Sequence, residues 1–237
     1  MNDRLHPAAH VRFDGSALSI EDVVALARGG SAAELSREPA FRQRIQRGAD
    51  FLDRLLREDG IVYGVTTGYG DSCTVAIPPE LTAQLPHRLY TYHGCGLGRM
   101  LAPQETRAVL AVRLQSLSQG VSGVSVALLE QLEQLLVHDV LPLIPAEGSV
   151  GASGDLTPLS YVAAALCGER EVLYRGQVRP SAEVLRELGL NALRLRPKEG
   201  LAIMNGTAVM TALACLAWQR AAYVSRLATR LTACNVL

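Results

Sequence analysis

Apolar residues recur three to four positions apart along most of this chain of 237 residues, which is the period of an amphipathic α-helix. In residues 38–60, for example, Phe41, Ile45 and Leu52 fall on one face, and the segment ends at Gly60. Hydrophobic residues make up 49% of the sequence, which is enough to build a sizeable core. The pattern predicts a mainly α protein with a few short strands.

Residues that start and stop helices set the expected boundaries. Ser19 and Asp22 form a candidate capping box, and Pro103 stands at a first-turn position. Thr157 is the expected N-cap of another helix, with Pro158 as its first residue. The predicted helices cover residues 19–30, 38–60, 102–120, 125–141, 155–168, 181–189 and a long stretch from about 201, with a hairpin at 171–179.

Residues 201–218 contain no charged side chain and approach the length of a membrane span. The stretch also contains Asn205, Gly206, Thr207 and Thr211 and is rich in alanine, which favours a helix buried in a bundle. We therefore expect no membrane association. The helix is predicted to continue to the last residue of the sequence.

The overall charge and the cysteines exclude several classes of protein. Lysine plus arginine equals aspartate plus glutamate at 23 each, so nothing favours nucleic acid or an anionic membrane as a partner. The five cysteines form no C-x-x-C pair, which is typical of reduced thiols in the cytoplasm and gives no metal site. The first fifteen residues lack the apolar run of a signal peptide.

Three glycine-rich loops are the candidates for chemistry. They are "YGVTTGYG" at 63–70, "YHGCGLG" at 92–98 and "GSVGASGDLTPLS" at 148–160. The first lacks the Lys-Ser/Thr pair of a P-loop, and the second has Arg99 where a dinucleotide fingerprint needs its last glycine. We therefore expect no nucleotide cofactor.

The third loop surrounds Ser153 with glycines, and several interpretations compete. A hydrolase elbow needs G-x-S-x-G, but Asp155 replaces the second glycine, and 142–150 is a poor strand with two prolines. A lactamase-like S-x-x-K fails because residue 156 is leucine. An ordinary loop that caps the next helix remains the simplest interpretation.

Self-cyclisation accounts for more of the residues in this loop. If the backbone is compressed, the Gly154 nitrogen can attack the carbonyl carbon of Ala152, and loss of water closes a five-membered ring. Loss of the Ser153 hydroxyl as a second water leaves a methylidene-imidazolone, which is a strong electrophile. Gly154 has no Cβ to block this approach, and Gly151 lets the loop bend. Asp155 is expected to help move protons during ring formation.

The loop, together with "YGVTTGYG" at 63–70, "HGCGLG" at 93–98, "RLQSLSQGVSG" at 113–123 and "KEGLAIMNGT" at 198–207, resembles the aromatic amino acid ammonia-lyase and aminomutase family. This family includes histidine, phenylalanine and tyrosine ammonia-lyases. The resemblance implies an N-terminal domain at 1–200 and, at 201–237, the first long helix of a central helical bundle. It also implies a homotetramer and a methylidene-imidazolone cofactor.

The resemblance assigns roles by position. Ala152, Ser153 and Gly154 match the triad that forms the electrophile, Tyr63 matches the base that takes the substrate β-proton, and Asn205 matches the asparagine that contacts the ring. Each assignment has a purely structural alternative. The tyrosine would then be a packed aromatic, and the asparagine a hydrogen-bonding residue inside a helix.

Substrate choice in the family follows two adjacent residues, which here are Tyr92 and His93. Histidine enzymes tend to have Ser-His, tyrosine enzymes His-Leu and phenylalanine enzymes Phe-Leu. His93 therefore favours histidine, with urocanate as the product, while Tyr92 fits none of these pairs and leaves tyrosine or another aromatic amino acid open. The chain also carries Gln115 where the family has asparagine.

The chain is shorter than family members, whose second half supplies further catalytic residues. We therefore expect a fragment of a longer enzyme or a truncated product that is weakly active or inactive and has Ser153 unmodified. The alternatives to an ammonia-lyase are a 2,3-aminomutase, a non-catalytic helical oligomerisation module and, less favoured, a serine hydrolase that uses Ser153.

Overall fold

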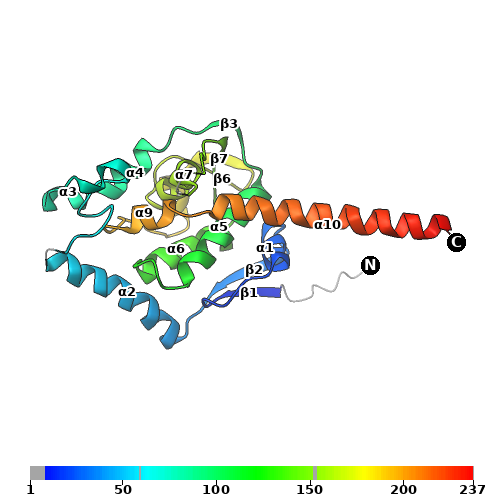
Figure 1. The fold of residues 1–237 in the computed structure, drawn as a ribbon, viewed down its shortest axis with the longest axis horizontal. Helices are drawn as coiled ribbons and strands as arrows, with labels where there is room; N and C mark the ends of the chain where they lie inside the picture. The colour runs from blue at the N-terminus through cyan, green and yellow to red at the C-terminus, as the bar shows by residue number, and fades with distance from the viewer. Residues whose placement is uncertain (1–8, 59, 152–153, 237) are drawn as a thin grey trace.

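The computed structural model describes residues 9–58, 60–151 and 154–236, so Ala152 and Ser153 lie outside the described residues. The chain is mainly α, as predicted, and Figure 1 shows a helical body from which the last helix extends. The helices are α1 (Ile20–Ala27), α2 (Pro39–Arg57), α3 (Pro79–Thr82), α4 (Leu85–Tyr92), α5 (Pro103–Ser118), α6 (Val126–Val137), α7 (Leu156–Leu166), α8 (Ser181–Glu187), α9 (Glu199–Met204) and α10 (Ala208–Val236), with a 3-10 turn at Gly70–Thr74.

Seven short strands form three small sheets at the edges of the helical body. They are β1 (Ala9–Phe13), β2 (Ser31–Leu35), β3 (Leu97–Met100), β4 (Leu141–Pro142), β5 (Pro145–Glu147), β6 (Glu171–Tyr174) and β7 (Gln177–Pro180). Strands β1 and β2 pair in parallel, whereas β3–β5 and β4–β6–β7 are antiparallel. The predicted hairpin is β6–β7, and Arg175 takes a positive φ of 50° in its turn.

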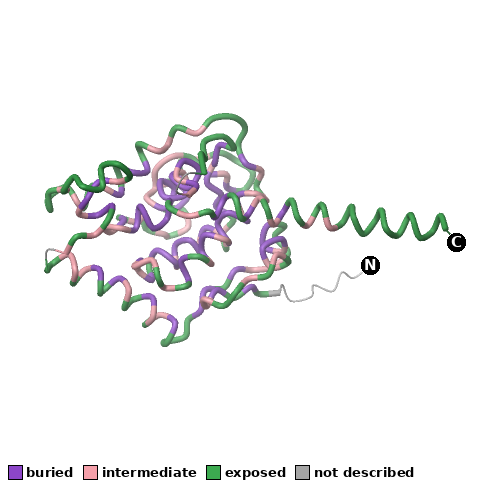
Figure 2. Tube along the Cα trace, viewed as in Figure 1, coloured by how far each residue is buried: buried purple, intermediate pink, exposed green. Residues whose placement is uncertain are grey.

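The core is built around α5, which packs against α1, α6, α9 and α10. Leu110, Leu114 and Leu117 of α5 are fully buried, because these positions recur on the face that the neighbouring helices cover. Buried residues gather in the body in Figure 2, while the far part of α10 is exposed. The core therefore fixes the start of α10 and leaves its C-terminal part without a neighbour in the described chain.

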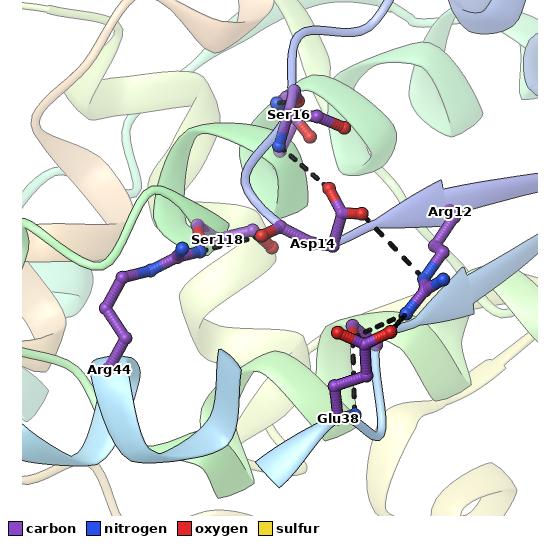
Figure 3. A network of polar contacts seen from close by, with 8 residues as sticks. Arg12, Asp14, Ser16, Glu38, Arg44 and Ser118 are labelled. Carbon is purple, nitrogen blue, oxygen red and sulfur yellow. Dashed lines mark hydrogen bonds and ion pairs between the residues drawn. The ribbon is translucent and has the colours of Figure 1, made fainter. Parts of the chain in front are cut away.

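A polar network ties α2 and β1 to the end of α5 (Figure 3). The Arg44 guanidinium donates through Nη2 to the carbonyls of Asp14, at 2.7 Å, and Ser118, at 3.1 Å. Arg12 donates to the Glu38 carboxylate at 2.6 Å, and the Ser16 backbone N–H donates to Asp14 at 2.8 Å. These bonds hold the loop after β1 against the end of α5.

The helix predicted at 125–141 ends at Val137, before strand β4, and two other predicted helix boundaries, which bear on the candidate site, were also wrong. The helix predicted to begin at Thr157 starts at Leu156, so Asp155 precedes it and Thr157 lies inside it. The long helix expected from about 201 is broken at Asn205–Thr207, between α9 and α10. In both cases the cause is a contact between distant segments, because Asp155 bonds to the first turn of α10.

The region from Glu199 to Val236 is long and apolar enough to cross a membrane by length and composition. Half of its apolar window is buried inside the protein, which is the behaviour of a core helix. All six residues of α9 are buried, and Ala208, Val209, Ala212 and Leu216 of α10 are buried as well.

Candidate functional site

The Ala-Ser-Gly loop meets the break between α9 and α10. Gly154 has a φ of +116°, and a Cβ at this position would lie 2.5 Å from the backbone nitrogen of Gly206. The backbone N–H of Asp155 donates to the Gly206 carbonyl at 2.8 Å. Glycine is therefore needed at 154 both for its backbone conformation and for the close approach of the second segment.

The Asp155 carboxylate is buried and accepts hydrogen bonds at both oxygens. Oδ2 accepts the backbone N–H groups of Val209, at 2.8 Å, and Met210, at 3.0 Å, while Oδ1 accepts the Ser149 hydroxyl at 2.8 Å. The first N–H groups of a helix have no partner within the helix, so Asp155 acts as an N-cap of α10 supplied from another part of the chain. Its negative charge also suits the positive end of the helix.

The second loop packs under the third. A Cβ on Gly148 would lie 2.5 Å from Cγ2 of Thr157 and 3.3 Å from the Cα of Gly96. The backbone N–H of Gly96 donates to the Tyr161 hydroxyl of α7 at 3.1 Å. The strand pair β3–β5 continues this contact, so the two loops are joined along the edge of the same small sheet.

The first loop lies against α9. Gly64 has a φ of +67°, and a Cβ there would lie 2.7 Å from Cδ2 of Leu201 and 2.6 Å from Cε1 of Tyr69. The Tyr63 ring meets Tyr69 edge-on, with centroids 6.4 Å apart, and the Tyr63 oxygen accepts the Gly70 N–H at 3.0 Å. Burial raises the pKa of Tyr69 to about 12, so Tyr69 stays protonated at neutral pH.

Tyr92 and His93 lie at the C-terminal end of α4, with ring centroids 5.1 Å apart. Tyr92 is 81% exposed, whereas His93 is partly buried. Burial lowers the pKa of His93, so the neutral imidazole is favoured at neutral pH. No hydrogen bond or ring contact in the described residues joins Tyr63 or His93 to Gly154.

Asn205 ends α9, and its backbone N–H donates to the Leu201 carbonyl at 2.7 Å. It stands in the break itself rather than inside a helix, so the alternative of a helix-interior asparagine was wrong. Asn205 is followed in the sequence by Gly206, and Gly206 contacts Gly154.

Sequence reasoning missed Arg113 of α5, which is only 3% exposed. Its Nη2 donates to the Ala202 carbonyl, and a Cβ on Gly206 would lie 2.1 Å from its Nη1. Burial lowers the pKa of Arg113 to about 10, and Asp155 opposes this shift. Arg113 is the first residue of the motif "RLQSLSQGVSG" and the only charged residue in it. That charge is the sequence signal that could have identified Arg113.

Gln115, which replaces the asparagine of the family pattern, does not face this region. Its Nε2 donates to the Ser16 carbonyl, in the loop after β1. The longer side chain therefore anchors the N-terminal loop to α5.

One cavity, of about 750 Å³, lies away from the Ala-Ser-Gly loop. It lies between α4 and residues 193–195 and includes Tyr92 and His87, but neither His93 nor Gly154. Tyr90 in its wall donates to Glu169 at 2.8 Å, and burial raises its pKa. Among residues 9–58, 60–151 and 154–236, no three His, Cys, Asp or Glu side chains are grouped so that they could hold a metal ion.

The family model described as aromatic amino acid lyase matches residues 18–237, which include the three glycine-rich loops described above and the break between α9 and α10. The chain belongs to this family. Among curated relatives, the histidine ammonia-lyase of Deinococcus radiodurans is 45% identical over 200 residues, which cover 84% of this chain and 38% of the relative. The histidine ammonia-lyase of Gloeobacter violaceus is 43% identical over 216 residues, which cover 91% of this chain and 42% of the relative.

Solved structures give the same result for the fold. A tyrosine aminomutase from Streptomyces globisporus matches with a TM-score of 0.80 at 36% identity, over 88% of this chain and 39% of that one. The histidine ammonia-lyase of Trypanosoma cruzi matches with a TM-score of 0.83 at 33% identity, over 92% of this chain and 42% of that one. The chain therefore has the ammonia-lyase fold and spans about two fifths of the length of these relatives.

Proposed function

We propose that this chain carries the electrophile-forming site of an ammonia-lyase, a carbon–nitrogen lyase that eliminates ammonia from an aromatic L-amino acid. Histidine is the favoured substrate, with urocanate as the product. The observation that carries the proposal is the approach of Gly154 to Gly206, with Asp155 bonded to the first turn of α10. The histidine ammonia-lyases among the relatives support the choice of substrate.

Ala152, Ser153 and Gly154 are the residues that would form the methylidene-imidazolone. The Gly154 nitrogen bonds to the Ala152 carbonyl carbon, the carbonyl oxygen leaves as water, and the Ser153 hydroxyl leaves with its Cα proton as a second water. The surroundings of Gly154 fit this ring, because a Cβ there would collide with the backbone of Gly206. Once formed, the ring supplies an electrophile that captures the substrate and makes the amine a better leaving group.

The contacts that hold Gly154 come from Asp155, Gly206 and α10, all within this chain. We therefore propose that the loop cyclises here, in place of the expectation that Ser153 stays unmodified. The expectation that this chain is weakly active or inactive stays a prediction.

Four further residues have places in this proposal. Tyr63 is the base that takes the β-proton, and its oxygen is held in place by the hydrogen bond that it accepts from the Gly70 N–H at 3.0 Å. Asn205 contacts the ring from the break between α9 and α10. Partial burial lowers the pKa of His93, which favours the neutral imidazole. A neutral imidazole has one donor and one acceptor nitrogen, so His93 can form a hydrogen bond with a substrate imidazole. Tyr92 lies beside it.

The test is product analysis with histidine, tyrosine and phenylalanine, comparing the wild-type chain with Ser153→Ala. We expect an α,β-unsaturated acid, formed fastest from histidine, and loss of turnover in Ser153→Ala. Unchanged turnover in that variant would remove the lyase proposal. Labelling of Ser153 by a fluorophosphonate would point to a hydrolase, and no turnover even in a protein that also carries the second half found in the relatives would favour a non-catalytic oligomerisation module.

A 2,3-aminomutase is a second candidate, because tyrosine aminomutase structures match this chain at 36% to 37% identity. An aminomutase returns the amine to the β-carbon, so its product is a β-amino acid. Detection of a β-amino acid in the same assay would favour this candidate.

We also propose a homo-oligomer, a tetramer in the family arrangement, located in the cytoplasm. Support for association comes from α10, whose exposed part carries Tyr223, Leu227 and Leu231 in line with buried Leu216. Support for the location comes from five cysteines that are all free thiols.

A further inference from the structure

Arg113 is a buried cation that forms no ion pair in the part of the chain that the structure describes. It lies in the middle of α5, and its Nη2 donates to the carbonyl of Ala202 in the last turn of α9. Carbonyl groups in a last helical turn lack partners within the helix, so Arg113 supplies the missing donor. Its Nε is buried and has no hydrogen-bond partner among residues 9–58, 60–151 and 154–236.

Gly206 lies between the Arg113 guanidinium and Gly154 of the Ala-Ser-Gly loop. A Cβ on Gly206 would lie 2.1 Å from Arg113 Nη1, and a Cβ on Gly154 would lie 2.5 Å from the Gly206 nitrogen. The Gly206 carbonyl in turn accepts the Asp155 N–H at 2.8 Å. Gly206 is therefore held between Arg113 and the loop that is to cyclise.

Burying the Arg113 cation costs free energy, because the charge is removed from water. We therefore expect this arginine to contribute an interaction that an apolar residue could not. An aliphatic side chain of similar length would fill the space without the penalty of removing a cation from water. Arginine, unlike an aliphatic residue, can bond to the α9 carbonyl and remain charged close to the Asp155 carboxylate. The placement suits a residue that holds both helix ends at the break.

We propose that Arg113 is a positioning residue for ring formation, which fixes the Asn205–Thr207 break so that Gly206 presses on Gly154. This inference rests on the proposed function, since it concerns the same loop. It assigns Arg113 no contact with substrate, and it makes the geometry of the break depend on a side chain from α5.

The first test measures amide hydrogen exchange by mass spectrometry in the whole chain, comparing wild type, Arg113→Met and Arg113→Lys. Methionine keeps the length without donors, and lysine keeps the charge with fewer donors. Arg107→Met is the matched control, because Arg107 lies on the same helix but bonds to Asp139 at the surface. We expect exchange at 205–210 to rise at least about tenfold in Arg113→Met, less in Arg113→Lys and not in the control.

The second test measures the fraction of the 148–160 peptide that has lost two waters in each protein. We expect a lower cyclised fraction in Arg113→Met, with partial recovery in Arg113→Lys and a wild-type value in Arg107→Met. Unchanged exchange at 205–210 in Arg113→Met overturns the inference, and so does a wild-type cyclised fraction in a variant with faster exchange.

The two tests separate this inference from the proposed function. If the wild-type peptide has lost no water, the proposed function fails, and the exchange measurement still decides whether Arg113 fixes the break. If Arg113→Met does not fold, Arg113→Lys decides, because wild-type exchange in that folded variant would overturn the inference.

Discussion

Asp155 illustrates how a single residue departs from its expected role. Its position after the triad suggested that it moves protons, yet both of its oxygens are occupied by donors from Ser149, Val209 and Met210. A carboxylate in this state first of all holds two segments together. Any part in proton movement has to be compatible with those three bonds.

Removing this cap should be costly. Asp155→Ala leaves two backbone N–H groups at the start of α10 without their acceptor, so we expect a loss of about 2–4 kcal/mol in the free energy of unfolding. Ser125→Ala, which removes an ordinary cap from α6, should cost about 1 kcal/mol. Urea denaturation of both variants measures the difference. An Asp155→Ala cost no larger than that of Ser125→Ala would contradict the cap assignment.

Two glycines of the third loop give a matched pair of variants. Gly154→Ala places a Cβ against Gly206 at a φ of +116°, whereas Gly151→Ala places one in open space at a φ of +66°. Both changes strain the backbone, by about 1–2 kcal/mol, but only Gly154→Ala adds a collision. We expect Gly154→Ala to have the lower melting temperature. The reverse order would show that the contact with Gly206 is not tight.

At the scale of elements, local sequence signals predicted several helix starts and one hairpin turn. The Ser19–Asp22 capping box, the start of α5 at Pro103 and the hairpin at Arg175–Gly176 were all confirmed. The break at Asn205–Thr207 was not predicted, because the cap of α10 comes from Asp155 and the α9 carbonyl is bonded by Arg113. Periodicity within one segment contains no information about such distant partners.

The candidate site shows the same limit. Motifs identified Gly154, Asp155 and Asn205 from the sequence, and the structure brings Gly154 and Asp155 against the residue that follows Asn205. Arg113 was missed because the periodicity of the helix alone does not distinguish it from Arg107, which lies nearer the surface of the same helix. The roles of Ala152 and Ser153 stay predictions, since both lie outside the described residues.

Because of Glu105 at the start of α5, we expect the free energy of unfolding to depend on pH. Glu105 accepts the Ala102 N–H at 2.7 Å, and its pKa is lowered mainly by its hydrogen bond from Arg99. A lowered folded-state pKa gives stability that is present above the ordinary carboxyl pKa and is lost as pH falls through the lowered one. Glu105→Gln should therefore be less stable than wild type at pH 7, and the gap should narrow as the pH falls below the ordinary glutamate pKa and through the lowered one. Urea midpoints across this range test it, and a constant gap would contradict it.

At the scale of the whole molecule, α10 extends beyond the body, and its far part is exposed (Figures 1 and 2). Leu216 is buried against the body, while Tyr223, Leu227 and Leu231 continue its spacing and are 58%, 42% and 57% exposed. A stripe of this kind is typical of a surface that another helix covers.

Charges on the stripe should therefore prevent association. In sedimentation velocity, we expect the wild-type chain to form oligomers, and Leu227→Glu with Leu231→Glu to shift it to the monomer. Ser225→Glu, on the same exposed part of α10, is the control and should behave as wild type. A monomeric wild type would remove the oligomer proposal, and so would a double variant that still associates.

The central claim is that Ala152, Ser153 and Gly154 close into a ring under contacts supplied by this chain. The most direct measurement is the mass of the purified chain and of its 148–160 peptide. The account predicts a deficit of two waters in that peptide and none in the same peptide of Ser153→Ala. A wild-type peptide with its full mass would contradict the account.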